Sequence, residues 1–312
     1  MKKVYKTLLV FVLLSVVVLY TIPVKQRNFE ELFRGGEPAV ARSLAAFRET
    51  PVKSLEAEGV EWPYLVRGEG PRTLLFLHGM GGAADIWWQQ IEALQPDFRI
   101  ISPTLPAVHT LQEATAGINH ILEAENVNRL SIVGTSMGGY IAQYYLSQYP
   151  ERVEQVVFGN TFPPNEIYRR ENGGLRKLVP WLPEWLVMSQ FRSNISKTVS
   201  PASGYSPLVE AYLLEQYSGL MSKEQFIGRF DIVLDSFAIN RSPDRQAVPK
   251  LIIESDNDPL VYPELRSRLK QAYPAAQVHT FSGTGHFTYL NEPEAYIEVL
   301  RRFFLQGNYS LP

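Results

Sequence analysis

A serine framed by glycines is the first feature of this sequence that could carry chemistry. Residues 134 to 139 read GTSMGG, with Ser136 at the centre, between the apolar run RLSIV and the stretch YIAQYYLSQY. The two flanking patterns predict a strand and a helix. A tight strand-to-helix turn would expose the Ser136 hydroxyl as a nucleophile, but a glycine turn with a helix-capping serine fits the same pattern. The motif alone leaves both interpretations open.

A nucleophilic serine needs a base, because its hydroxyl reacts weakly at neutral pH. The chain has five histidines, and His286 lies in GTGHF, directly after the strand-like run QVHTF. We therefore expect His286 at the carboxyl edge of a sheet, where Ser136 is also expected. The other four lie at a strand end, beside or within a helix, or inside a strand: His78, His109, His120 and His279. His286 is the predicted base.

The base in turn needs a carboxylate that orients it. The stretch LIIESDNDPLV offers Glu254, Asp256 and Asp258 where a predicted strand opens into a loop. Asp258 is favoured, because the following Pro259 suits a turn just before the next helix. Asp256 remains the alternative, since spacing alone does not separate neighbours in one loop. The unused acids are expected to be solvated turn residues or helix caps.

Backbone amides near Ser136 would have to stabilise the oxyanion of a tetrahedral intermediate. Residues 77 to 82 read LHGMGG and follow a buried strand, so their glycines allow the backbone to approach a ligand. The amides of Met80 and Met137 are the predicted donors. His78 is then expected to hold the loop rather than to act as a base. A glycine-rich turn with no ligand is the competing interpretation.

Alternating strands and helices must position these residues. The predicted strands cover residues 62–67, 73–78, 98–102, 129–133, 153–159, 250–254 and 277–281. The predicted helices between and after them cover residues 84–94, 111–125, 140–149, 263–273 and 293–304. This alternation predicts an α/β fold with a mostly parallel sheet covered on both faces. From Thr161 to about Val248 only helical patterns occur, which predicts a cap over the carboxyl edge of the sheet.

Composition excludes several classes of function. The 312 residues carry a formal net charge of -2, which gives no electrostatic case for nucleic acid binding. The chain has no cysteine, so disulfides, zinc–thiolate sites and cysteine nucleophiles are excluded.

The N-terminus differs from the rest of the chain. Thr7 to Val24 carries no charge, and its length approaches the ~20 residues of a membrane-spanning helix. We expect an uncleaved anchor in residues 1–27, since the first Ala-x-Ala cleavage pattern, at residues 39–41, lies far downstream. A cleaved secretory signal is the alternative. Lysines before the run favour a catalytic domain on the non-cytoplasmic side.

The expected domain plan follows from these patterns. Residues 28–58 are predicted to form a linker with a short helix, and residues 59–312 the catalytic domain with its cap at about 161–248.

Four motifs in order, LHGMGG, GTSMGG, ESDNDPLV and GTGHF, make the chain resemble the α/β-hydrolase superfamily over roughly residues 60 to 306. The resemblance implies a serine esterase or lipase that acts on a small-molecule ester or a lipid and uses no metal or cofactor. It implies Ser136, Asp258 and His286 as nucleophile, acid and base, in the order of that family. Dehalogenases and epoxide hydrolases of this fold use an aspartate nucleophile, so Ser136 argues against them.

One departure supplies a second hypothesis. Many relatives have a "DxxGxGxS" loop after the strand near residue 100, whereas this chain has the shorter PTLPAVHTLQEA. That loop, GNTF at residues 159–162 and the cap are similar to maspardin, a subgroup often regarded as non-catalytic. This weaker resemblance implies a binding or adaptor protein on a hydrolase scaffold. Maspardin lacks the histidine, however, and His286 is present here.

Overall fold

A mostly parallel sheet of eight strands organises the molecule. The computed structural model describes residues 2–240 and 242–306. The strand order is β1-β2-β4-β3-β5-β6-β7-β8. The strands from β4 to β8 in this order pair in parallel, while β1 and β2 are antiparallel at one edge. The strands are β1 (Lys53–Ala57), β2 (Val60–Arg67), β3 (Thr73–Leu77), β4 (Arg99–Pro103), β5 (Leu130–Thr135), β6 (Val153–Gly159), β7 (Lys250–Ser255) and β8 (Gln277–Phe281).

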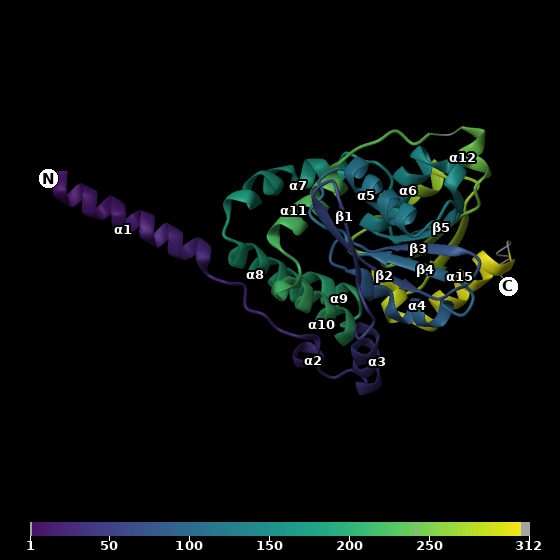
Figure 1. Ribbon diagram of the computed structural model, residues 1–312, viewed down its shortest axis with the longest axis horizontal. Coiled ribbons are helices and arrows are strands. Elements are labelled where there is room, and N and C mark those ends of the chain that lie inside the picture. The colour runs from purple at the N-terminus through teal and green to yellow at the C-terminus, as the bar shows by residue number, and fades with distance from the viewer. Residues whose placement is uncertain (1, 241, 307–312) are drawn as a thin grey trace.

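Helices cover both faces of this sheet, as the alternating pattern predicted (Figure 1). In β3, Leu74 and Phe76 belong to one core cluster and Leu75 and Leu77 to another, because successive strand residues point to opposite faces. The first face packs on α4 (Trp88–Leu94) and α15 (Pro293–Gln306), and the second on α5 (Leu111–Ala124), α6 (Met137–Gln148) and α13 (Pro263–Ala272). Short helices η1 (Ala84–Trp87), η2 (Pro150–Arg152) and α14 (Thr288–Asn291) complete this framework.

A helical insertion joins β6 to β7, which confirms the predicted cap. It contains α7 (Ile167–Leu178), η3 (Val179–Trp181), α8 (Glu184–Asn194), η4 (Ile195–Val199), α9 (Ser200–Ala202), α10 (Pro207–Glu215), η5 (Gln216–Leu220), α11 (Lys223–Leu234) and α12 (Pro243–Ala247). Cap residues such as Val209 and Tyr212 share a core cluster with the sheet, so the cap is packed onto the domain.

Residues 28–58, expected to be a linker with a short helix, contain α2 (Phe29–Leu32), α3 (Pro38–Arg48) and strand β1. Phe29 and Phe47 are fully buried in the core cluster of α4 and α15. The Phe29 amide donates to Glu215 Oε1 at 2.8 Å, so the segment is fastened to cap helix α10. The sheet therefore begins at Lys53 rather than at the expected boundary near residue 59. Residues 307–312, which the expected domain includes, lie outside the described residues.

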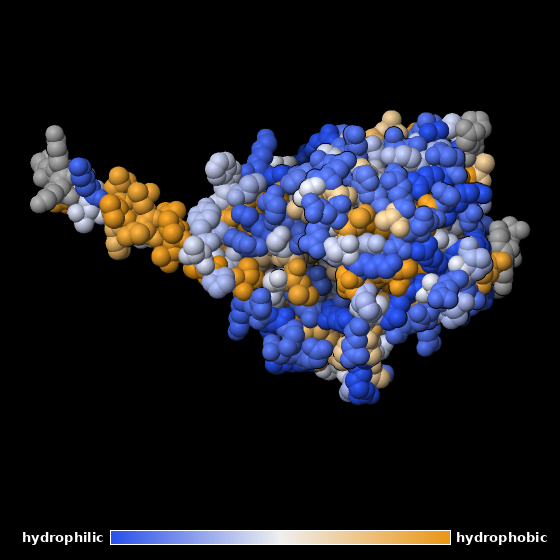
Figure 2. All heavy atoms as spheres, in the orientation of Figure 1, coloured by the Kyte–Doolittle hydropathy of each residue, from blue (hydrophilic) through white to orange (hydrophobic). Residues whose placement is uncertain are grey.

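The N-terminal helix α1 (Lys2–Thr21) projects away from the rest of the molecule (Figure 1). Its segment Val4–Thr21 has a mean hydropathy of 2.1, and none of that segment is buried. Figure 2 shows this helix as a continuous apolar surface. Its length and composition suit a membrane span, and a signal sequence has the same properties.

Candidate active site

Ser136 stands at a strained turn between β5 and α6. Its backbone has φ 52° and ψ -119°, a region that residues with a side chain rarely adopt. A Cβ at Gly134 would lie 2.3 Å from the Gly138 carbonyl oxygen, and one at Gly138 would lie 2.1 Å from that of Leu77. Both positions therefore require glycine. The Ser136 side chain makes no capping bond to α6, so the helix-cap interpretation of this serine does not hold.

His286 and Asp258 are paired in the loops that follow β8 and β7. His286 Nδ1 lies 2.8 Å from Asp258 Oδ2 and 3.0 Å from Oδ1. The Asp258 side chain is fully buried, and that of His286 is 7% exposed. Since the carboxylate accepts a hydrogen bond, Nδ1 carries the proton and the other ring nitrogen is free to act as a base.

Three donors besides His286 hold the Asp258 carboxylate. The amides of Leu260 and Val261 donate to Oδ1, and Asn160 Nδ2 donates to Oδ2 at 3.0 Å. Burial alone would raise the pKa of Asp258, but the charge and hydrogen bonds of His286 and the bonds from Asn160 and Val261 outweigh it. The pKa of Asp258 is therefore lowered, and the carboxylate is ionised at neutral pH.

Asn160 was missed by the sequence reasoning. It follows β6 with a positive φ of 40°, and its side-chain oxygen accepts a hydrogen bond from Thr288 Oγ1 at 3.0 Å. The motif GNTF had been noted only for its likeness to a subgroup. An asparagine tolerates positive φ better than most residues, and this is the one signal in the sequence that could have pointed to it.

Asp256, the alternative acid, contacts the backbone of the histidine loop rather than the His286 ring. Its carboxylate accepts from the Gly283 amide and from Ser282 Oγ, both at 2.8 Å. The Gly283 amide bond, followed by the Ser282 bond, lowers the pKa of Asp256. The structure thus brings Asp258, and not Asp256, to the imidazole.

The LHGMGG loop lies directly against the serine. A Cβ at Gly79 would lie 3.3 Å from Ser136 Cβ, so these two segments are in contact. No hydrogen bond within the described residues uses the Met80 amide. The Met137 amide is in the first turn of α6, where amides have no partner inside the helix. Neither amide donates a hydrogen bond within the described residues, and the oxyanion role expected for them stays a prediction.

His78 holds this loop from beneath. It is fully buried; its Nε2 accepts from the Leu105 amide at 2.9 Å, and its Nδ1 lies 2.7 Å from the Gly79 carbonyl oxygen. These partners assign the proton to Nδ1. Burial, reinforced by the charge of Arg229, lowers the pKa of His78 to about 3. The imidazole is neutral and has no nitrogen left for the serine.

A buried arginine from cap helix α11 ties the same loop to the cap. Arg229 is 1% exposed and donates to the carbonyl oxygens of Met80, Gly82 and Leu105 at 2.7–3.0 Å. Burial lowers the pKa of Arg229 to about 10, so it remains charged at neutral pH. No sequence motif indicated a buried position for Arg229, because an arginine on an amphipathic helix normally points to solvent.

Ser136 and His286 line one cavity of about 210 Å³ beneath the cap. Its walls are largely apolar and come from the cap and from the loop after His286; they include Phe191, Ile195, Val199, Leu213, Tyr217, Phe287 and Tyr289. Within the described residues, no group of three or more His, Asp or Glu side chains is arranged to hold a metal ion. The cavity thus brings the predicted nucleophile and the predicted base together.

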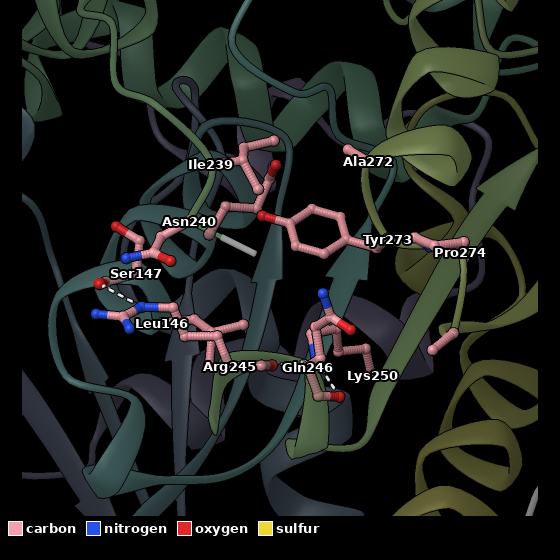
Figure 3. A pocket seen from close by; sticks show the side chains of 12 residues that line it. Leu146, Ser147, Ile239, Asn240, Arg245, Gln246, Lys250, Ala272, Tyr273 and Pro274 are labelled. Atoms are coloured by element: carbon pink, nitrogen blue, oxygen red, sulfur yellow. Dashed lines mark hydrogen bonds between the residues drawn. The ribbon is translucent and has the colours of Figure 1, made fainter. Parts of the chain in front are cut away.

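A second pocket, of about 150 Å³, lies at the opposite end of the strands and is shown in Figure 3. It surrounds Lys250, the first residue of β7, and the ring of Tyr273. Lys250 Nζ donates to the carbonyl oxygens of Arg245 and Val248, both at 2.6 Å, and burial lowers its pKa to about 8. The ammonium is held by backbone acceptors, so this pocket offers no comparable nucleophile and base.

Comparison of the chain with known proteins shows the family to which it belongs. Residues 72–293 match the family model of the alpha/beta hydrolase fold. An uncharacterised protein of Mycobacterium tuberculosis is 24% identical over 84% of each chain. A pimeloyl-[acyl-carrier protein] methyl ester esterase of Vibrio campbellii is 24% identical over 76% of this chain and 95% of its own. The crystal structure of the enol-lactonase from Burkholderia xenovorans superposes with a TM-score of 0.68 at 17% identity, covering 81% of this chain and 99% of its own.

The order of strands, the helical insertion and the family match agree with the resemblance seen in the sequence, whereas the weaker likeness to maspardin stays a prediction. The chain belongs to the alpha/beta hydrolase fold family.

Proposed function

We propose that the protein is a serine hydrolase that cleaves carboxylic esters through an acyl-enzyme on Ser136. The observation that carries this proposal is the shared cavity, which is lined by the strained Ser136 and by His286, with Asp258 bonded to the far side of the imidazole. An acyl-transfer site needs these parts: a serine and a histidine that share one cavity, and a buried carboxylate hydrogen-bonded to the histidine.

The roles follow from the geometry. The Ser136 hydroxyl attacks the ester carbonyl while His286 Nε2 takes its proton, and Asp258 holds the imidazolium in place. The amides of Met80 and Met137 donate to the oxyanion of the tetrahedral intermediate. His286 then protonates the leaving alcohol, and a water activated by the same histidine hydrolyses the acyl-enzyme. These steps need no metal and no cofactor.

The substrate class rests on the cavity wall and on the relatives. Apolar side chains such as Phe191 and Leu213 suit an acyl chain rather than a charged group. Two of the similar proteins, a methyl ester esterase and an enol-lactonase, are named for ester chemistry. Both considerations favour a carboxylic ester with an apolar acyl part.

We also propose that α1 is a retained anchor, with the catalytic domain on the non-cytoplasmic side. The uncharged run from Thr7 to Val24 is long enough to span a bilayer, and three lysines precede this run, at positions 2, 3 and 6. Phe29 is the first fully buried side chain after the helix, so the folded domain begins close behind the span. The protein should therefore stay in the membrane fraction after a high-salt wash. Intact protein found mainly in the soluble fraction, or a mature N-terminus that begins after Tyr20, would contradict the anchor proposal.

A fluorophosphonate probe tests the chemical proposal. The wild type should be labelled at Ser136, as identified by peptide mass spectrometry, and the Ser136→Ala protein should not be labelled. Labelling should also fail or slow sharply in His286→Ala, because the serine then lacks its base. A folded wild-type protein that is inert to the probe would instead favour a binding or adaptor protein on this scaffold.

A further inference from the structure

The last turn of α1 lies against the cap. The Tyr20 hydroxyl donates to the carbonyl oxygen of Trp181, and Trp185 Nε1 donates to the carbonyl oxygen of Leu19 at 2.9 Å. Trp181 ends η3 and Trp185 lies in the first turn of α8. Figure 1 shows α8 between the end of α1 and the sheet. One end of the apolar helix is therefore joined directly to the part of the molecule that covers the active site.

The connection from α1 to the domain is short and packed. Helix α1 ends at Thr21 and α2 begins at Phe29. Between them, Val24 packs against the main core cluster, and beyond them Phe29 is buried and bonded to Glu215. The last turn of α1 is thus held close to the cap and to the folded domain.

An exposed apolar surface occurs on the cap at this junction. We define the cap rim as Leu175, Leu178 and Trp181, which are 47%, 54% and 76% exposed. Leu175 and Leu178 are on the last turn of α7, which runs into the turn that ends at Trp181. A tryptophan next to the end of a spanning helix is typical of the membrane interface, where its ring meets the headgroups and acyl chains. Large exposed apolar side chains otherwise cost solubility.

We propose that the cap rim docks on the bilayer that α1 spans, and that the enzyme takes amphiphilic esters from that bilayer. This inference rests on the proposed anchor and ester hydrolysis. Helix α8 supports the substrate part, because it starts beside α1 and carries Phe191 and Asn194 in the wall of the catalytic cavity. Six residues of helix place Phe191 roughly 9 Å along the axis from Trp185. An acyl chain that leaves the membrane beside the rim therefore has a short way to the wall of the cavity that Ser136 lines.

Tryptophan fluorescence in vesicles tests the docking without using activity. The full-length protein is reconstituted into phosphatidylcholine vesicles with brominated acyl chains, which quench nearby tryptophans. Three of the other four tryptophans, Trp62, Trp87 and Trp88, are buried in the domain. We expect clear quenching in the wild type and markedly less in Trp181→Phe. Equal quenching in the two proteins would overturn the docking.

Kinetics test the supply of substrate from the bilayer. The double variant Leu178→Ser, Trp181→Ser should hydrolyse a long-chain ester embedded in vesicles about fivefold or more slowly than the wild type, because apolar contact with the bilayer is lost. Its rate on water-soluble p-nitrophenyl acetate should not change. The matched control is Tyr205→Ser, a 71% exposed aromatic outside the rim, which should behave as the wild type on both substrates. Equal wild-type and double-variant rates on the embedded ester would overturn the inference.

The two underlying proposals fail in distinguishable ways. If the anchor proposal is wrong, a sedimentation assay will show the protein released from the vesicles before any quenching is measured. Loss of the ester proposal would be seen as no turnover of either ester by the wild type, while the Trp181-dependent quenching remains.

Discussion

The two ends of the parallel strands differ in how they hold their buried charged groups. At the carboxyl end, Asp258 is held by side chains and amides from separate loops, and its histidine partner faces a cavity. At the amino end, Lys250 donates hydrogen bonds to backbone carbonyl oxygens of residues only two to five positions away. A shifted pKa occurs at both ends, so the shift alone does not identify a catalytic group. A catalytic group is identified instead by its hydrogen-bond partners and by whether one of those partners faces a cavity.

The largest expected effect separates the two ends directly. Ser136→Ala should lower kcat for an activated ester by several orders of magnitude, since the nucleophile is lost. Lys250→Met should leave kcat within about twofold, because the lysine contacts no residue of the catalytic cavity. Steady-state kinetics on folded proteins, checked by circular dichroism, measure both. A Lys250→Met protein as inactive as Ser136→Ala would break the comparison.

The next largest effect distinguishes two carboxylates within one loop. Asp258→Asn should lower kcat by roughly 10³- to 10⁴-fold, because the amide favours the wrong imidazole tautomer. Asp256→Asn should cost less than about tenfold, because this carboxylate holds the Gly283 amide and the Ser282 hydroxyl rather than the ring. The two variants are compared by kcat at a pH where wild-type activity is maximal. The reverse ranking would assign the acid to Asp256.

A smaller effect concerns Arg229, the arginine that joins the cap to the LHGMGG loop. Arg229→Met should lower kcat by about 10- to 100-fold with a smaller change in KM, because the Met80 amide loses its fixed position. The matched control is Arg245→Met at the amino end, where the guanidinium donates to the Ser147 carbonyl oxygen and to Ser242 Oγ. That variant should keep wild-type kcat. A rise in KM alone for Arg229→Met would show that the arginine serves substrate binding instead.

The smallest expected effect is a pH dependence of stability. The pKa of His78 is about 3 in the folded protein and ordinarily near 6.5, so the unfolded chain binds more protons between these values. The free energy of unfolding should therefore fall by about 1.4 kcal/mol for each pH unit as pH drops from about 6 toward 4. Urea titrations at several pH values measure this slope. The slope should be shallower by that amount in His78→Gln, and an unchanged slope would exclude His78 as its source.

Short motifs explain why the grouping of Ser136, Asp258 and His286 could be predicted from the sequence. LHGMGG and GTSMGG each combine a buried strand, glycines that close contacts require, and one reactive or structural side chain, so local sequence specifies local structure. The structure places Ser136 and His286 on one cavity and pairs His286 with Asp258, the acid favoured by its proline neighbour. The choice between Asp258 and Asp256 needed the structure, because both lie in one loop and differ only in the direction of their side chains.

Long-range contacts explain what the sequence did not reveal. Arg229 is on a cap helix and meets Met80 only after the chain has returned over the sheet, 149 residues away. Residues 28–58 were predicted to be a linker because charged residues are mixed among their apolar ones. The contact between Phe29 and cap helix α10 joins residues far apart in the sequence. Strand β1 was likewise absent from the predicted strands. Strand β2 corresponds to the strand predicted at residues 62–67, but its antiparallel pairing was not predicted, since strand direction depends on pairing partners rather than on local pattern.

The positive φ angles of Ser136 and Asn160, at the ends of the neighbouring strands β5 and β6, have a consequence for evolution. Each such residue stores about 1–3 kcal/mol of strain that glycine would relieve. A population selected only for heat resistance would gain stability by replacing either residue with glycine. It would thereby discard the proposed nucleophile or the amide that holds Asp258. Both strained residues are therefore expected to persist only under selection for the proposed hydrolysis.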